Sequence, residues 1–125
     1  MTRDELADLT AKWISLWCPP VDWALYDALH ADDFRDGSSA GREPTKAGFA
    51  EGVEQLARIF PDLETRIEDL VIDEERQTVA VRWSARGTAV EPGRPVTLTG
   101  IEIIRVREGR IAERWGEWDP GPGNG

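Results

Sequence analysis

The sequence predicts one α+β domain in which helices come first and a mostly antiparallel sheet follows. Apolar residues up to Pro61 recur at spacings of three and four, which is typical of helices, whereas later residues alternate with a period of two, which is typical of strands. A length of 125 residues fits one domain. We therefore expect a single domain over residues 1–119 and a flexible tail over residues 120–125, which contain no apolar side chain.

Three helices are expected before the sheet, over residues 2–18, 22–30 and 45–60. Thr2 and Glu5 match a capping box, and Asp22 and Thr45 are candidate N-caps for the second and third helices. Prolines follow the first and third helices and end them. The chain leaves the second helix after His30, and the Gly- and Ser-rich residues 35–44 are expected to form a loop.

Four strands joined by short turns are expected after the third helix, over residues 63–72, 78–90, 96–107 and 110–119. In the second of these strands, Val79, Val81 and Trp83 alternate with polar residues. One face of the sheet is therefore apolar and available to the helices, and the other is polar. The whole pattern predicts a strongly curved sheet that wraps around the helices and leaves a hollow end.

The turn at Glu108 and Gly109 sets the orientation of the last hairpin. A two-residue turn would need a left-handed Glu108, which is uncommon, so we predict a three-residue turn with a bulge at Gly109. This register groups one set of side chains on one face: Ile101, Ile103, Arg105, Ile111, Glu113, Trp115, Glu117 and Asp119. The isoleucines and the tryptophan indicate that this is the inner face, and Glu102 and Arg114 become cross-strand partners on the other face. A slip of one residue would reverse the assignment.

Charge and composition exclude several classes of function. The formal net charge is -9 and the cations form no cluster, so neither nucleic acid nor an anionic membrane surface is an expected partner. No apolar stretch approaches the roughly 20 residues that span a bilayer, and the acidic N-terminus does not resemble a signal peptide. A cytoplasmic location is therefore expected. One histidine and one cysteine cannot build a zinc site, and the sequence has no phosphate-binding or dinucleotide-binding motif, so no metal or cofactor is expected.

Three residues are candidates for catalysis, each with a structural alternative. Asp119 ends the last strand, where partial burial would raise the pKa of its carboxyl for proton transfer, or where it caps the strand end in water. His30, the sole histidine, is followed by Asp32 and could act as a base, or it could interact with the carbonyls at a helix end. Tyr26 lies one turn earlier and could present its hydroxyl to the cavity or serve only in packing.

The segments VAVRWSARGTA and TGIEIIRVREGRIAERWGEWD resemble the SnoaL-like polyketide cyclase and ester cyclase group of the NTF2-like superfamily. The matching positions are Arg86-Gly87-Thr88, the hairpin from Arg105 to Ile111, Glu113, Trp115 and Asp119, with His30 to Phe34 and Phe60 to Leu63 as further landmarks. The resemblance implies a cone-shaped NTF2-like α+β fold, commonly a homodimer, with a pocket between helices and sheet. It also implies that Asp119 is the acid/base for an intramolecular aldol ring closure without metal or cofactor.

The leading hypothesis is a cofactor-free cyclase, isomerase or lyase that acts on a small, partly apolar carbonyl compound. Asp119 would be the general acid/base, assisted by His30 or Tyr26. The residues expected to contact the substrate are Trp83, Trp115, Phe60, Ile101, Ile103 and Arg105. A non-catalytic module that binds an apolar metabolite is the alternative, favoured by Ala89 in place of a family histidine and by the isoleucine-rich strand. A third possibility is an interaction domain whose outer sheet face joins another chain.

Overall fold

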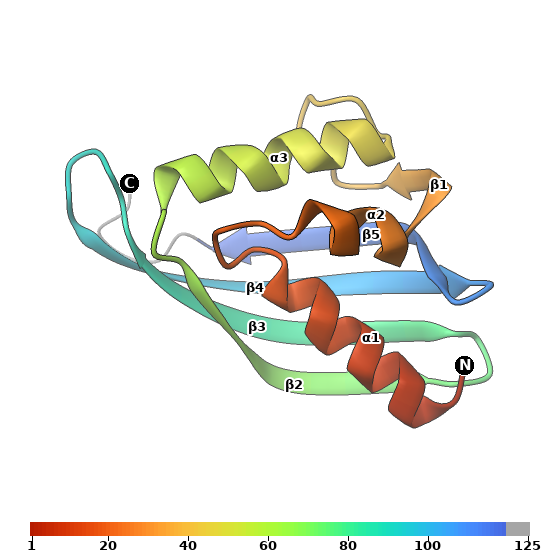
Figure 1. Cartoon of the computed structure of the whole chain (residues 1–125). Helices are drawn as coiled ribbons and strands as arrows, with labels where there is room; N and C mark the ends of the chain where they lie inside the picture. Colours follow the sequence, from red (N-terminus) through yellow and green to blue (C-terminus); the bar gives the residue numbers. More distant parts are fainter. Residues whose placement is uncertain (120–125) are drawn as a thin grey trace.

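A computed structural model describes residues 1–119 as three helices and a five-stranded sheet (Figure 1). The elements are α1 (Arg3–Ser15), α2 (Trp23–Leu29), β1 (His30–Asp36), α3 (Lys46–Ile59), β2 (Glu64–Asp73), β3 (Thr78–Thr88), β4 (Pro95–Arg107) and β5 (Arg110–Asp119). The strand order is β1-β5-β4-β3-β2, with β1 parallel to β5 and the other neighbours antiparallel. The α+β prediction is confirmed. The tail expected at residues 120–125 lies outside the described residues.

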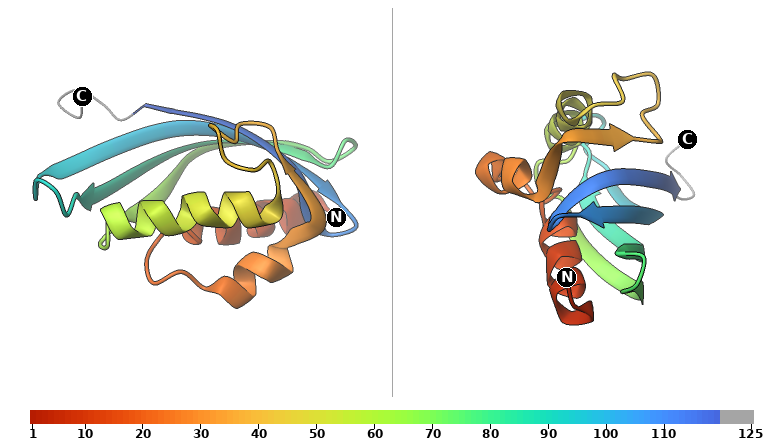
Figure 2. Two further views of the ribbon diagram at one scale, coloured as in Figure 1. Left: turned by 90° about the horizontal axis from the view of Figure 1, so that it is seen from above. Right: turned by 90° about the vertical axis from the view of Figure 1, so that its right-hand side faces the viewer.

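The three helices cover one face of a curved sheet, which we call the inner face (Figure 2). The hydrophobic core lies between this face and the helices, with α1 packed against β2 and α3 against β1. Within residues 1–119 no helix lies on the opposite, outer face. None of the three helices is long and apolar enough to cross a membrane.

The side chains expected to cap the helices do so. Glu5 N–H donates to Thr2 Oγ1 at 3.2 Å, and the Glu5 carboxylate accepts from Thr2 N–H at 2.8 Å, which completes the capping box of α1. Asp22 accepts from Leu25 N–H at the start of α2, and Thr45 caps α3 in the same way. These local bonds explain why the helix starts could be predicted from the sequence.

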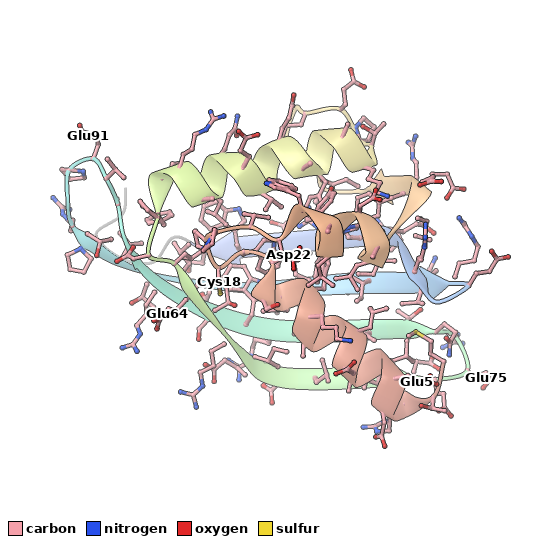
Figure 3. All side chains as sticks on the ribbon, viewed as in Figure 1. Glu5, Cys18, Asp22, Glu64, Glu75 and Glu91 are labelled. Carbon is pink, nitrogen blue, oxygen red and sulfur yellow. The ribbon has the colours of Figure 1, made fainter. Side chains whose placement is uncertain are left out.

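The acidic side chains labelled in Figure 3 are exposed: Glu5, Asp22, Glu64, Glu75 and Glu91. Cys18, also labelled there, lies between the end of α1 and the start of β2. Its thiol is half-buried, with Sγ 3.2 Å from Thr65 Oγ1.

Strand β1 was not predicted. Residues that we expected to leave α2 and enter a loop instead form a parallel strand beside β5, with His30 opposite Ile111 and Asp36 opposite Arg114. Three of its seven residues are aspartates, which are disfavoured in strands, so its local sequence gave no strand signal. The pairing with β5 stabilises it and brings Asp36 beside Arg114.

The last hairpin differs from the prediction at its turn. Glu108 and Gly109 are both left-handed, with φ values of 53° and 77°, so the turn has two residues and the predicted three-residue turn is wrong. The bulge lies in β5, where the pairing shifts between Arg105 and Val106 of the partner strand. Beyond the bulge Ile103 lies opposite Trp115, so these two side chains share a face as predicted. Glu102 lies opposite Gly116 and not opposite Arg114, its predicted cross-strand partner, although the two side chains form an ion pair.

Apart from Ile111, which is buried as predicted, the inner and outer faces of this hairpin are reversed relative to the prediction. Ile101 and Ile103 are 54% and 40% exposed on the outer face, whereas Ile104 is fully buried. The physical reason lies in β3, whose residue Trp83 points inward and pairs with Gly100 of β4. A Cβ atom at Gly100 would collide with the Trp83 indole, so the glycine provides the space that this large side chain needs. Residues 98, 102, 104 and 106 of β4 share that inner face and are buried.

Candidate active site

A cavity of about 590 Å³ lies between α3 and the inner face of β3, β4 and β5. Its volume is in the range of small-molecule sites. The aromatic and aliphatic residues of the wall include Trp17, Phe49, Phe60, Trp83 and Leu98. Three charged residues of the sheet, Glu102, Arg114 and Glu117, contribute to the same wall. The cavity is therefore apolar with a few localised polar groups, as expected for an oriented organic ligand.

Glu102 projects from the middle of β4 into this wall and is 2% exposed. Arg114 Nε and Nη2 both donate to Oε1, at 3.0 and 2.7 Å. The other carboxylate oxygen, Oε2, accepts from Trp83 Nε1–H at 3.4 Å, which is long for a hydrogen bond. One oxygen of Glu102 is therefore firmly held while the other keeps capacity to accept a proton.

Asp36 completes a buried network with Arg114. Arg114 Nη1 donates to Asp36 Oδ1 at 2.8 Å, and Ser38 N–H donates to the same oxygen at 2.9 Å. The guanidinium also lies over the Phe49 ring, 5.0 Å from its centroid. Arg114 is 7% exposed and lies between two carboxylates, which compensates the cost of burying its charge.

A glycine in β5 makes room for this network. A Cβ atom at Gly116 would collide with Arg114 Nη2 and with Glu102 Oε1. Gly116 N–H donates to Ser38 Oγ at 3.0 Å, so the strand stays attached to the loop after β1. The ion pair of Glu102 and Arg114 occupies the place that a side chain at position 116 would fill.

The environment of Glu102 shifts its proton affinity. Burial raises the pKa of the Glu102 carboxyl above its ordinary value, and the nearby charge of Asp36 adds to the rise, while Arg114 and Trp83 oppose it. A carboxyl with a raised pKa can exchange protons closer to neutral pH. The guanidinium beside it is suited to stabilising negative charge on a substrate oxygen.

The structure brings only part of the expected site together. Trp83 and Phe60 line the cavity. The inward orientation predicted for the outer-face residues is wrong: Ile101, Ile103, Arg105, Trp115 and Asp119 point away from the helices. The guanidinium of Arg105 lies over the Trp115 ring on that outer face, 5.3 Å from its centroid.

Asp119 is exposed at the end of β5, opposite Thr99. It borders a second hollow of about 440 Å³, together with Ile101 and Trp118. The predicted acid/base role of Asp119 stays a prediction, but its carboxylate lies outside the cavity that contains Glu102.

His30 and Tyr26 are held by bonds within the core. Trp13 Nε1–H donates to His30 Nε2 at 3.0 Å, and His30 Nδ1 lies 2.7 Å from the Tyr26 carbonyl oxygen. Both ring nitrogens are satisfied by a neutral imidazole that carries its proton on Nδ1. Burial lowers the pKa of His30 to about 4. The Tyr26 hydroxyl donates to the Lys46 carbonyl at 2.6 Å, and burial raises the pKa of this phenol.

Sequence reasoning paired Glu102 with Arg114 but placed the pair on the outer face, and it missed Asp36 and Arg42. The sequence of β3 contained a pattern from which the inner position of Glu102 could have been predicted. The inward alternation of Val81 and Trp83, continued through a four-residue turn at residues 91–94, places Glu102 on the inner face. Asp36 and Arg42 had no comparable signal, because their positions depend on β1 and the loop after it.

The site residues offer carboxylate and guanidinium chemistry. Within residues 1–119, no three His, Cys, Asp or Glu side chains are grouped so as to hold a metal ion. A carboxylate next to a cation, in a largely apolar wall, can remove a proton from a carbon acid and support the resulting oxyanion.

The model of the SnoaL-like polyketide cyclase family matches residues 7–121. The chain belongs to this family. The predicted NTF2-like α+β fold of this SnoaL-like protein also agrees with solved structures. It is 28% identical to IdmH, a proposed polyketide cyclase from Streptomyces antibioticus, over 91% of each chain, with a TM-score of 0.78. A search of curated proteins found no match.

Two further structures share the fold at lower identity. A proposed polyketide cyclase from Bacillus cereus is 22% identical with a TM-score of 0.81, and the match covers 95% of this chain and 79% of that one. AclR, a proposed hydroxylase from Streptomyces galilaeus, is 20% identical with a TM-score of 0.83, and the match covers 97% and 83%. Proteins with this fold are thus described with different chemistries, so the reaction must be inferred from the residues of the site.

Proposed function

We propose that this SnoaL-like protein is a cofactor-free enzyme of the cyclase, isomerase or lyase type. Its substrate would be a small, partly apolar compound that carries a carbonyl group. The observation that carries the proposal is the position of Glu102, a buried carboxyl with a raised pKa that lines the cavity beside Arg114. The apolar wall would take up the hydrocarbon part of the substrate and exclude water.

In the proposed reaction, Glu102 accepts a proton from the carbon next to the substrate carbonyl. The electron pair of the broken C–H bond moves to the carbonyl oxygen and forms an enolate. For ring closure, the enolate carbon attacks a second carbonyl of the same molecule, and Glu102 returns its proton to the new alkoxide. For isomerisation, the proton returns to a different carbon. No oxidant, reductant or further reactant is needed.

Arg114 would stabilise the enolate oxygen. Three of its N–H groups donate to Glu102 and Asp36, which leaves two of the five guanidinium donors unused among residues 1–119. Its hydrogen bond to Asp36 and its contact with the Phe49 ring fix the orientation of the guanidinium. Such a preorganised cation in a poorly hydrated site stabilises developing negative charge more strongly than water does.

The family resemblance instead implies Asp119 as the acid/base. Asp119 ends β5 on the outer face, outside the cavity that contains Glu102, so a substrate bound in that cavity would meet Glu102 and not Asp119. We therefore favour Glu102 for this role. The two carboxylates can be separated by experiment, because they lie on opposite faces of the sheet.

The test measures hydrogen–deuterium exchange at the carbons next to the carbonyl of 2-tetralone, a small bicyclic ketone, by proton NMR in D₂O. Glu102→Gln keeps the shape of the side chain but removes the base, and we expect the protein-dependent rate to fall about 100-fold. Glu113→Gln, an outer-face change on β5, is the matched control and should leave the rate unchanged. The rate should rise with pH through an apparent pKa above the ordinary 4.5 of a glutamate, because the base must be deprotonated.

Asp119→Asn decides between the two carboxylates. Loss of exchange in Asp119→Asn with normal exchange in Glu102→Gln would assign the base to Asp119 and overturn our assignment. Binding of 2-tetralone without exchange would favour the alternative function, a module that binds an apolar metabolite. The observation that supports this alternative is the ion pair itself, since Arg114 lowers the basicity of Glu102. The homodimer that the resemblance implies stays a prediction.

A further inference from the structure

Arg42 places a second guanidinium at the cavity, where its side chain packs against α3. It belongs to the loop between β1 and α3 and lines the cavity with a side chain that is 24% exposed. Its Nε–H donates to the Gly48 carbonyl at 3.2 Å. Its guanidinium carbon lies over Gly52, where a Cβ atom would approach it to 2.8 Å. The two glycines therefore let the guanidinium lie flat against the helix.

The N–H groups on the terminal nitrogens of Arg42 remain available to donate hydrogen bonds to a ligand. Nη2 lies 3.6 Å from Asp36 Oδ2, an ion pair that is too long for a hydrogen bond. Asp36 Oδ2 is buried and has no hydrogen-bond partner in the described part of the chain. Asp36 is instead bonded to Arg114 and Ser38 through its other oxygen. Arg42 thus carries a positive charge that no hydrogen bond to a carboxylate of residues 1–119 satisfies.

We propose that Arg42 binds a carboxylate group of the ligand at the α3 side of the cavity. A planar guanidinium matches a carboxylate through two parallel hydrogen bonds. Leu56, Ile59 and Phe60, which lie further along α3 and at its end in the same cavity wall, would contact the hydrocarbon part of the same ligand. This binding site adds to the proposed function. It rests on that function only in one respect, that the carbonyl end of the same ligand reaches Glu102.

The other charges around the cavity define where an anion can bind. Arg114 already donates to two carboxylates, and Glu117 on β5 would repel an anion on the opposite side. The protein as a whole carries a formal charge of -9, so an anionic ligand needs a local cation to bind. Arg42 is the charged residue of this wall that meets the requirement.

The test compares two probes that differ in charge at one end, 6-fluoro-2-naphthoate and the neutral 6-fluoro-2-naphthamide, in ¹⁹F NMR titrations. The unmodified protein should bind the naphthoate about tenfold more tightly than the amide. Arg42→Gln should abolish this preference and leave the affinity for the amide unchanged. Arg58→Gln is the matched control, because it removes the same charge from an exposed site on α3 and should keep the preference.

Equal affinity for the two probes in the unmodified protein would overturn the proposal, as would an equal loss of preference in Arg42→Gln and Arg58→Gln. If Arg42→Gln does not fold, Arg42→Lys should retain part of the preference, and the amide signals of Gly48 and Gly52 should shift with the naphthoate only. Unshifted glycine signals would overturn the proposal. The preference should persist in Glu102→Gln, so a failure of the carboxylate site is distinguishable from a failure of the proposed catalysis.

Discussion

The two faces of the β4–β5 hairpin show how differently similar side chains can be used. On the inner face, Glu102 and Arg114 are 2% and 7% exposed and form a hydrogen-bonded network with Asp36. On the outer face, Ile101 and Ile103 are exposed, and the charged Arg105 lies on an aromatic ring near the solvent. The charged pair is inside and two of the isoleucines are outside.

This difference shows that the position of the helices, and not only the hydrophobicity of each side chain, decides which residues of a sheet are buried. The inner face tolerates charge because the buried Arg114 lies between two hydrogen-bonded carboxylates, which offsets part of the desolvation cost. The outer face tolerates isoleucine because an exposed apolar side chain has only a small energetic cost. Chemistry that needs a dry carboxylate is therefore expected on the inner face.

The largest expected effect is that of removing the inner cation. Arg114→Met leaves Glu102 and Asp36 buried without their common partner, and the free energy of unfolding should fall by about 3–5 kcal/mol at pH 7. Arg105→Met, which removes the same charge from the outer face, should cost less than about 1 kcal/mol because that pair is exposed. Urea denaturation followed by circular dichroism measures both. Equal losses would contradict the comparison.

The buried groups His30 and Glu102 should also make the free energy of unfolding depend on pH in the acid range. The pKa of His30 is about 4 in the folded protein and 6.5 as a free side chain, so between these values the unfolded state binds a proton that the folded state does not. The free energy of unfolding should therefore fall as the pH is lowered from about 7 to 4, by about 3 kcal/mol from this group. The raised pKa of Glu102 acts in the opposite direction.

His30→Gln isolates the contribution of the histidine. Its unfolding free energy should depend much less on pH between 7 and 4 than that of the unmodified protein, when both are measured by urea denaturation in the same buffers. Identical slopes would show that the imidazole does not stay neutral in the folded state.

The smallest expected effect comes from two adjacent isoleucines on opposite faces. Ile104→Val removes a buried methylene and should lower the free energy of unfolding by about 1 kcal/mol. Ile103→Val makes the same change on the outer face and should stay within about 0.5 kcal/mol of the unmodified protein. Thermal unfolding of the two variants provides the measurement. A similar loss at Ile103 would show that the outer face is covered in solution, as in the expected homodimer.

The sequence by itself determined the features that depend on neighbouring residues. The capping box of Thr2 and Glu5, the N-caps Asp22 and Thr45, and the four strands after α3 all follow from local bonds and from the alternation of side chains. The sequence also placed Ile103 and Trp115 on the same face of the last hairpin, because side chains alternate along each strand. The family motifs lie in the same segments.

Only the tertiary structure decided which face of the sheet the helices cover and which charged residues meet there. Strand alternation has the same period for either face, so a pattern with apolar residues on both sides of β4 does not reveal which is inside. Asp36 and Arg42 depend on the pairing of β1 with β5 and on the loop that follows, which joins residues about 80 positions apart in the chain. Contacts over such separations are not encoded in local propensity, and here they create the candidate site.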